Sequence, residues 1–195
     1  MSRKIKNLVT SLLAGSLLIA SVQAASFPDV DANADYAEAV DYVSEEGIIV
    51  GDSAGNFNPD QTVTRAQMAA IICRMLGETE ETSSTSKFSD VSADYWANAF
   101  IVKAADLGII SGYSDDTFRP DNAVTYEQAI TMVIRAVGGE EVAQASGGYP
   151  SGYVTAADEN GFLENVSTKM GDPFPRRDVA AVLYNFYIMS SNIDG

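Results

Sequence analysis

The chain contains no histidine among its 195 residues and has one cysteine, Cys73. Without an imidazole there is no Ser-His-Asp or Cys-His nucleophile and no histidine ligand for zinc. A single cysteine cannot form a disulfide within the chain, and the apolar run around Cys73 predicts a buried small hydrophobe. The sequence therefore excludes most hydrolase mechanisms and any scaffold that depends on disulfides.

Basic residues are also scarce, with 12 Lys and Arg against 27 Asp and Glu, for a net charge of −15. Binding to nucleic acid requires a basic face that neutralises phosphates, and this composition cannot supply one. We therefore expect no nucleic-acid partner. Such acidity mostly helps to keep a protein soluble.

The one long apolar run covers residues 8–20, after three basic residues in the first six positions and before the small-residue sequence of residues 22–24. This pattern is typical of a secretory signal peptide, expected over residues 1–25. The run is too short for the roughly 20 residues that span a bilayer. Removal of the leader takes away three of the 12 basic residues and none of the 27 acidic ones, which leaves a charge of −18. We expect a secreted protein that is not held in the membrane.

An internal repeat follows the leader. Compared with itself at an offset of 61, the chain matches residues 27–30 with 88–91, 47–51 with 108–112, and 56–60 with 117–121. In a third, degenerate copy, residues 161–163 and 175–183 correspond to residues 47–49 and 64–72. This periodicity predicts three copies, at residues 27–77, 88–138 and 149–189, joined by polar linkers at residues 78–87 and 139–148.

Each copy has the pattern helix, loop, helix. Apolar residues recur at i, i+3, i+4, i+7 and i+8 in the second helix, and a glycine (Gly47, Gly108 or Gly161) ends the first. The expected helices cover residues 35–46, 64–77, 94–107, 125–138, 152–160 and 175–189. One helix pair has too little core to be stable alone, so we expect one all-α body in which three helix-loop-helix repeats share a core around a pseudo-threefold axis.

The second helices of the first two copies begin with a capping box, Thr64 with Gln67 and Thr125 with Gln128. Capping explains these four residues but not Arg65, because a cation in the first turn faces the positive end of the helix dipole.

Arg176 occupies the position of Arg65 in the third copy, beside Arg177, whereas the second copy has Tyr126 there. A helix N-terminus and a guanidinium together form a good site for a carboxylate or phosphate. The alternative is a solvated surface arginine. Because folding alone would favour an acid here, we expect Arg→Ala changes at Arg65 and Arg176 to leave the fold intact. Tyr126 can contact a sugar but cannot neutralise an anion.

The loops 51–60 and 112–121 are rich in oxygen ligands, but their spacing does not fit an EF-hand. We expect turns that direct Phe57 and Phe118 into the core, with no metal and no cofactor. Trp96, near the start of a first helix, fits either the core or the lining of a groove that holds sugar rings.

Taken together, the motifs Phe-x-Asp-Val, Trp-Ala, Gly-Ile-Ile-x-Gly-Tyr, Thr-Phe-Arg-Pro-Asp and Thr-Arg-Ala-Gln resemble the surface-layer homology (SLH) module. The resemblance covers residues 27–187 and is weakest in the third copy. It implies a three-pronged spindle whose grooves bind secondary cell-wall polysaccharide, often through a pyruvate ketal. In that family the arginine of the Thr-Arg-Ala-Glu motif contacts the polymer, which corresponds to Arg65 and Arg176 here.

The predicted function is therefore non-enzymatic, non-covalent anchoring to the bacterial cell wall. The candidate polymer-binding residues are Arg65, Arg176, Arg177, Thr64, Thr125, Tyr126 and Trp96. Two alternatives remain open. One keeps the fold and binds peptidoglycan or another envelope protein, and the other is a carbohydrate-active hydrolase with paired carboxylates.

Overall fold

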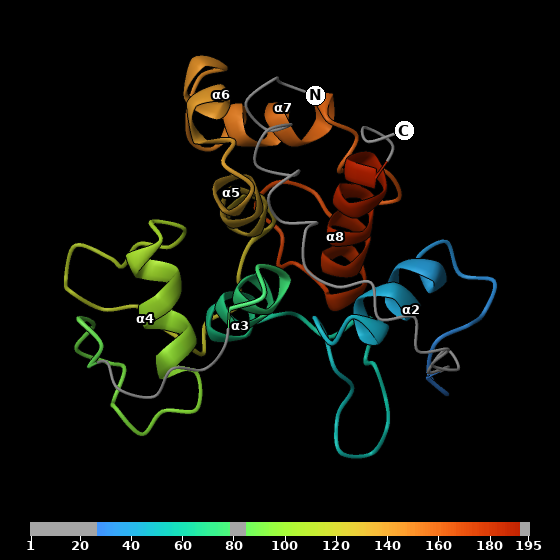
Figure 1. The fold of residues 1–195 in the computed structure, drawn as a ribbon, viewed down its shortest axis with the longest axis horizontal. Coiled ribbons are helices and arrows are strands. Elements are labelled where there is room, and N and C mark those ends of the chain that lie inside the picture. Colours follow the sequence, from blue (N-terminus) through green and yellow to red (C-terminus); the bar gives the residue numbers. More distant parts are fainter. Residues whose placement is uncertain (1–26, 79–84, 192–195) are drawn as a thin grey trace.

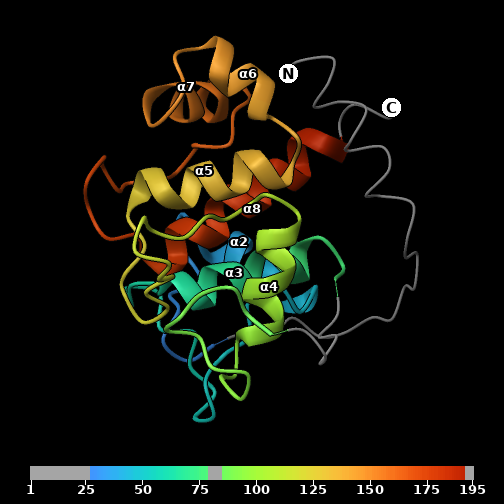
Figure 2. The ribbon, with the colours of Figure 1, turned by 90° about the vertical axis from the view of Figure 1, so that its left-hand side faces the viewer.

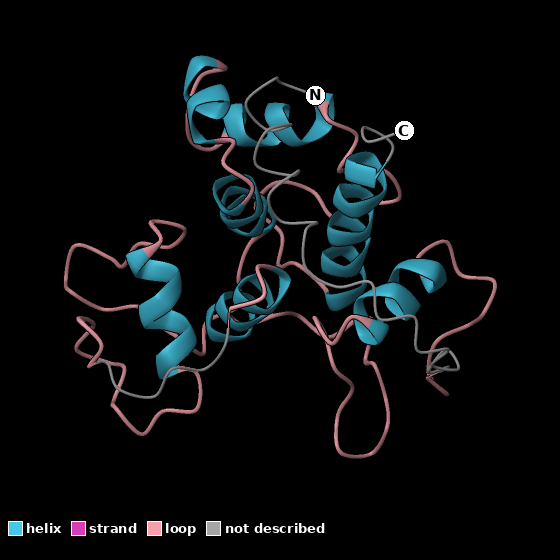
Figure 3. Cartoon of the chain, in the orientation of Figure 1, coloured by secondary structure: helices cyan, strands magenta, loops and turns pink. Residues whose placement is uncertain are grey.

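The computed structural model describes residues 27–78 and 85–191. The expected signal peptide lies outside these residues, as does most of the expected first linker. Within the described parts there are helices and no β-strand, which confirms the all-α class (Figure 3). No helix in these parts is long and apolar enough to cross a membrane.

Seven helices cover the described residues. They are α2 (Ala37–Glu45), α3 (Arg65–Met75), α4 (Asn98–Asp106), α5 (Tyr126–Ala136), α6 (Glu140–Ala145), α7 (Ser151–Glu159) and α8 (Arg176–Ser191). All six expected helices are present, with ends that differ from the expected ones by a few residues. The seventh, α6, lies in the expected linker 139–148, where acidic residues in its first turn favour a helix that periodicity did not predict.

Local signals in the sequence explain where the helices begin and end. Thr64 caps α3, because its hydroxyl accepts from the amide of Gln67 (3.2 Å) and the Gln67 side chain accepts from the Thr64 amide (3.0 Å). After α2, Gly47 adopts a left-handed conformation with φ of 66°, as the glycine signal predicts.

Each second helix packs against the first helix of the following copy. α3 packs on α4, α5 packs on α7, and α8 returns to α2, so that the last helix of the chain covers the first (Figures 1 and 2). The helices of one copy therefore find their main partners in other copies. The core is shared, as the size of one helix pair requires.

A closed ring of three backbone hydrogen bonds joins the segments that lead into α3, α5 and α8. The amide of Val63 donates to the carbonyl of Phe174 (3.0 Å), that of Phe174 to Val124 (3.0 Å), and that of Val124 to Val63 (2.9 Å). All three side chains are fully buried. Because each bond links two different segments, the ring relates the starts of α3, α5 and α8 to one another.

The loops before the ring bring aromatic side chains into this core. Phe57 and Phe118 are both fully buried, as expected. Cys73 is also fully buried, and this burial raises the pKa of its thiol to about 11. The thiol is therefore un-ionised and structural at neutral pH.

We predict that residues 26–80 do not fold alone. This fragment contains α2 and α3 but lacks α8 and α4, so the apolar faces that these helices bury would be exposed to water. Circular dichroism during urea titration should show a cooperative transition for the whole chain and a gradual, non-cooperative change for the fragment. A cooperative transition in the fragment would contradict the shared core.

Candidate binding grooves

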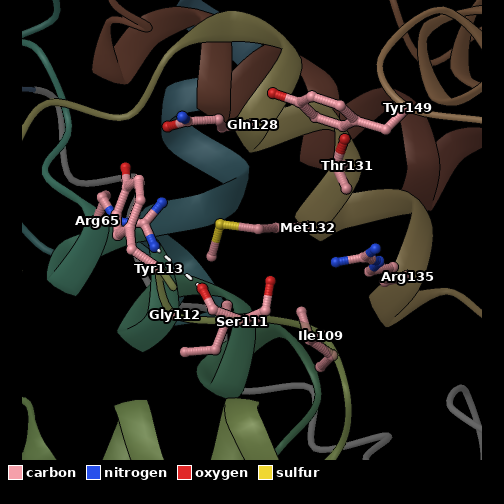
Figure 4. Close-up of a pocket in the computed structure, with 11 residues that line it drawn as sticks. Arg65, Ile109, Ser111, Gly112, Tyr113, Gln128, Thr131, Met132, Arg135 and Tyr149 are labelled. Carbon is pink, nitrogen blue, oxygen red and sulfur yellow. Dashed lines mark hydrogen bonds between the residues drawn. The ribbon is translucent and has the colours of Figure 1, made fainter. Parts of the chain in front are cut away.

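Two grooves on the surface have equivalent linings. The Arg65 groove, about 270 Å³, lies between α3 and α5 and is lined by Arg65, Ile109, Ile110, Ser111, Gly112, Tyr113, Gln128, Thr131, Met132, Arg135 and Tyr149 (Figure 4). The Arg176 groove, about 360 Å³, is lined by Ile49, Val50, Gly51, Asp52, Asn58, Gln61, Gln67, Ala70, Ile71, Arg74, Trp96 and Arg176.

The two grooves share four chemical features at corresponding positions of the repeat. Each has an arginine from the first turn of a second helix, a glutamine and a further arginine from the next second helix, and an exposed aromatic ring. The corresponding pairs are Arg65 with Arg176, Gln128 with Gln67, Arg135 with Arg74, and Tyr149 with Trp96. The same candidate site therefore occurs twice.

Arg65 is fixed by backbone carbonyls of the second copy. Its Nε donates to the carbonyl of Phe118 (2.8 Å) and its Nη2 to that of Ser111 (3.3 Å). The guanidinium also lies 4.5 Å from the ring centroid of Phe118 and 5.0 Å from that of Tyr113. Arg65 is 8% exposed, and these carbonyls use two of the five N–H donors of its guanidinium.

Arg176 makes the same contacts with the first copy. Its Nε donates to the carbonyl of Phe57 (2.7 Å) and its Nη2 to that of Val50 (2.9 Å), and the guanidinium lies 4.8 Å from the Phe57 ring centroid. Burial lowers the pKa of both Arg65 and Arg176, but an arginine stays protonated at neutral pH. Each groove thus contains a fixed positive charge.

These contacts correct one expectation. The first-turn arginines do not serve only a ligand outside the protein, because each joins its own helix to the loop of the next copy. Without Arg65 and Arg176, the buried carbonyls of Phe118 and Phe57 would lose their charged hydrogen-bond donors. Their removal is therefore expected to affect the fold.

An aspartate of the Phe-x-Asp-Val motif holds each of these loops. Asp29 accepts from the amides of Phe57 (2.9 Å) and Asn58 (2.7 Å). Asp90 accepts in the same way from Phe118 (2.7 Å) and Arg119 (2.7 Å). The motif thus supports the carbonyls that position the arginines.

An aspartate also holds the corresponding loop of the third segment, but it comes from a helix and not from a Phe-x-Asp-Val motif. Asp178, on α8, accepts from the amide of Thr168 (2.9 Å) and from that of Ser167 (3.2 Å). It is 2% exposed, so it supports the loop from inside the fold. Asp178 therefore holds this loop in a segment that lacks the Phe-x-Asp-Val motif.

The structure places only some of the predicted site residues in the grooves. Arg65, Arg176 and Trp96 line them, and Trp96 is 54% exposed. Thr64 caps α3, and Thr125 takes the equivalent position before α5, where its amide donates to Gln128 (3.3 Å).

Tyr126 and Arg177 lie elsewhere. Tyr126 is 7% exposed and packs edge-on against Phe174 at 5.6 Å, so its ring is part of the core, and it lines neither groove. Arg177 pairs with Asp60 and Asp178 and lines neither groove.

Sequence reasoning missed the second arginine of each groove and the aromatic Tyr149. Arg74 and Arg135 match at the offset of 61, which was the available signal, but both are near the end of a helix where a cation is ordinary. Tyr149 precedes a helix of the third segment and lines the Arg65 groove (Figure 4), as Trp96 lines the Arg176 groove.

The oxygen-rich loops form hydrogen bonds within themselves. Asp52 accepts from the amides of Ala54 and Asn56, both at 2.9 Å, and from Nδ2 of Asn58 at 2.8 Å. Within residues 27–78 and 85–191, no group of three or more His, Cys, Asp or Glu side chains is arranged to hold a metal ion. Independence from metal remains a prediction.

Comparison with known proteins gives a family for two parts of the chain. Residues 26–69 and 87–130 match the S-layer homology domain. Over 191 residues the chain is 29% identical to the middle cell wall protein of Brevibacillus brevis, covering 92% of this chain and 18% of that protein. It is 30% identical over 177 residues to a cell surface protein of Thermoanaerobacter kivui, covering 89% of this chain and 23% of that protein.

A shorter match includes an enzyme. An endoglucanase of a Bacillus species is 37% identical over 92 residues, which are 47% of this chain and 10% of the enzyme. The chain thus spans about a quarter or less of the length of these three relatives. The matches associate it with the bacterial cell wall or cell surface as a secreted protein.

We predict that Arg65→Ala and Arg176→Ala each lower the free energy of unfolding by about 2 to 4 kcal/mol, since each removes a charged donor from two carbonyls. Lys169→Ala, at an exposed cation outside the grooves, should change it by less than about 0.5 kcal/mol. Urea titration checks both values. Arginine variants as stable as Lys169→Ala would show that these bonds do not support the fold.

We also predict equal melting temperatures with calcium and with chelator. The carboxylate of Asp52 already has donors from its own turn, so calcium would have to displace them. Differential scanning calorimetry of the full chain makes the comparison. A rise of several degrees with calcium would identify a metal site in these loops.

Proposed function

We propose that this chain, two segments of which match the S-layer homology domain, is a non-enzymatic module that attaches to the bacterial cell wall by binding an anionic secondary cell-wall polysaccharide. The observation that carries the proposal is the pair of equivalent grooves, each with a fixed guanidinium and an exposed aromatic ring. The guanidinium suits a carboxylate, and the ring suits the apolar face of a sugar.

The local charge of the grooves supports an anionic ligand. The whole chain carries a net charge of −15, but each groove has two arginines in its lining. A carboxylate such as that of a pyruvate ketal would meet attraction in the grooves and repulsion from most of the remaining surface. This contrast favours binding at two defined places.

We further propose that residues 149–189 are a third, degenerate module and that the three modules form a three-pronged spindle. The ring of Val63, Val124 and Phe174 supports this arrangement, because Phe174 donates one backbone hydrogen bond and accepts one, as Val63 and Val124 do. The packing of α8 against α2 also supports it, because this contact brings the last copy against the first.

The third groove of such a spindle would lie between α5 and α8, and it lacks the binding chemistry. Tyr126 takes the place of the first arginine and is buried. Asn185 takes the place of the second and donates to the carbonyls of Phe162 (3.1 Å) and Glu164 (2.7 Å). Asp35 takes the place of Trp96 and Tyr149. We therefore expect two binding grooves and not three.

The groove linings favour binding over hydrolysis. Glycoside hydrolysis ordinarily needs two carboxylates on either side of the scissile bond. Among the lining residues, the Arg176 groove contains one carboxylate, that of Asp52, and the Arg65 groove contains none. Neither groove can supply the acid and base pair.

We predict that pyruvylated wall polysaccharide binds the full chain and that removal of the ketal weakens binding at least tenfold, because the arginines lose their carboxylate partner. Calorimetric titration with polymer before and after mild acid treatment measures the difference. Binding should also weaken with added salt.

Trp96→Ala and Arg65→Lys provide the matched variants. Trp96→Ala should weaken binding several-fold through lost stacking, and Arg65→Lys should retain part of the affinity because lysine supplies charge without the planar fork. Equal binding of treated and untreated polymer would contradict an anionic ligand. Tighter binding to purified peptidoglycan than to the polysaccharide would favour the alternative partner.

A further inference from the structure

The second arginines of the two grooves occupy equivalent positions but have different partners. In the Arg65 groove, Nε of Arg135 pairs with Oε2 of Glu140 (3.0 Å) and Nη2 donates to the hydroxyl of Tyr153 (3.2 Å). In the Arg176 groove, Arg74 lies 5.3 Å from the ring centroid of Phe100 and has no carboxylate partner within the described parts of the chain. Among the described residues, the charge of Arg135 therefore has a carboxylate partner, whereas that of Arg74 does not.

Helix α6, which the first copy does not have after α3 in the described residues, supplies the group that compensates Arg135. Glu140 also accepts from the Tyr153 hydroxyl (2.6 Å) and from Nε2 of Gln144 (3.0 Å). Burial raises the pKa of Glu140, but the bonds from Tyr153, Gln144 and Arg135 outweigh this and lower it below the ordinary value. Glu140 is therefore ionised at neutral pH and holds Arg135 in place.

For the first-turn arginines the difference between the grooves is reversed, because a carboxylate lines the groove of Arg176 and none lines that of Arg65. Asp52 lines the Arg176 groove, and its negative charge acts on Arg176, opposing the effect of burial on the pKa of that guanidinium. The corresponding residue in the Arg65 groove is the neutral Tyr113, whose ring lies 5.0 Å from Arg65 and 3.8 Å from Arg119. Arg65 therefore has no carboxylate beside it in the groove lining.

We propose that the two grooves hold the carboxylate of the same anionic sugar at opposite ends, at Arg65 in one groove and at Arg74 in the other. Figure 4 shows that Arg65 and Arg135 stand at opposite ends of their groove, with Met132 between them. Because the two linings correspond, we expect Arg176 and Arg74 to lie likewise at opposite ends of the Arg176 groove. This inference rests on the proposed function and adds Arg74 as a specificity-determining residue.

The single tryptophan of the chain allows one groove to be observed alone. Trp96 lines the Arg176 groove, so its fluorescence reports binding there, and calorimetry reports both grooves together. The probe is a methyl hexopyranoside that carries a pyruvate ketal, with the same glycoside lacking the ketal as the control ligand.

For the full chain, Arg74→Gln should raise the dissociation constant followed by Trp96 about tenfold, and Asp52→Asn should lower it a few-fold. Lys169→Gln removes one positive charge outside both grooves and should change it by less than twofold. Arg74→Gln equal to Lys169→Gln would overturn the proposal.

Glu140→Gln tests the other groove. Added to Arg74→Gln, which weakens the Arg176 groove, it should raise the remaining calorimetric affinity several-fold because it frees the charge of Arg135. Melting temperatures establish that both variants are folded. An unchanged affinity would overturn the compensation of Arg135 by Glu140. Failure of the unaltered chain to bind the ketal glycoside would instead refute the proposed function itself.

Discussion

The ring of hydrogen bonds among Val63, Val124 and Phe174 is the constraint on which the remaining structure depends. Each bond joins two of the three segments that lead into α3, α5 and α8, so the ring ties all three together. The residue two positions after each of them begins a second helix, and in two cases that residue is an arginine. The ring therefore places Arg65 and Arg176 against the loop of the following copy, where the two grooves form. Fold and site are determined by the same few backbone contacts.

The first-turn arginines have a structural role and a proposed binding role. Two donors of each guanidinium satisfy carbonyls of the neighbouring loop, and each arginine also lines a groove. A guanidinium fixed in this way loses little conformational freedom when an anion binds, which raises affinity without further contacts. The same arrangement makes loss of binding and loss of stability hard to separate at Arg65 and Arg176. Arg74 donates to no loop carbonyl in residues 27–78 and 85–191, so the two effects separate there.

The sequence predicted the features that are encoded locally. The capping residues around Thr64 gave the start of a helix, Gly47 gave the end of another, and the apolar stripes gave the need for a shared core. It did not predict that Arg65 reaches carbonyls 46 and 53 positions away, or that Tyr126 is buried against Phe174, because both depend on how the copies pack. It also missed α6, which lies in a polar stretch without apolar periodicity.

The central claim is that two grooves bind the anionic sugar and that the face beside Tyr126 does not. A crystal structure of the chain with a selenium-labelled ketal glycoside tests it most directly, because anomalous scattering locates each bound ligand independently of the model phases. We predict two ligand peaks, one in the Arg65 groove and one in the Arg176 groove. A peak between α5 and α8 beside Tyr126, or peaks away from both arginine-lined grooves, would contradict the account.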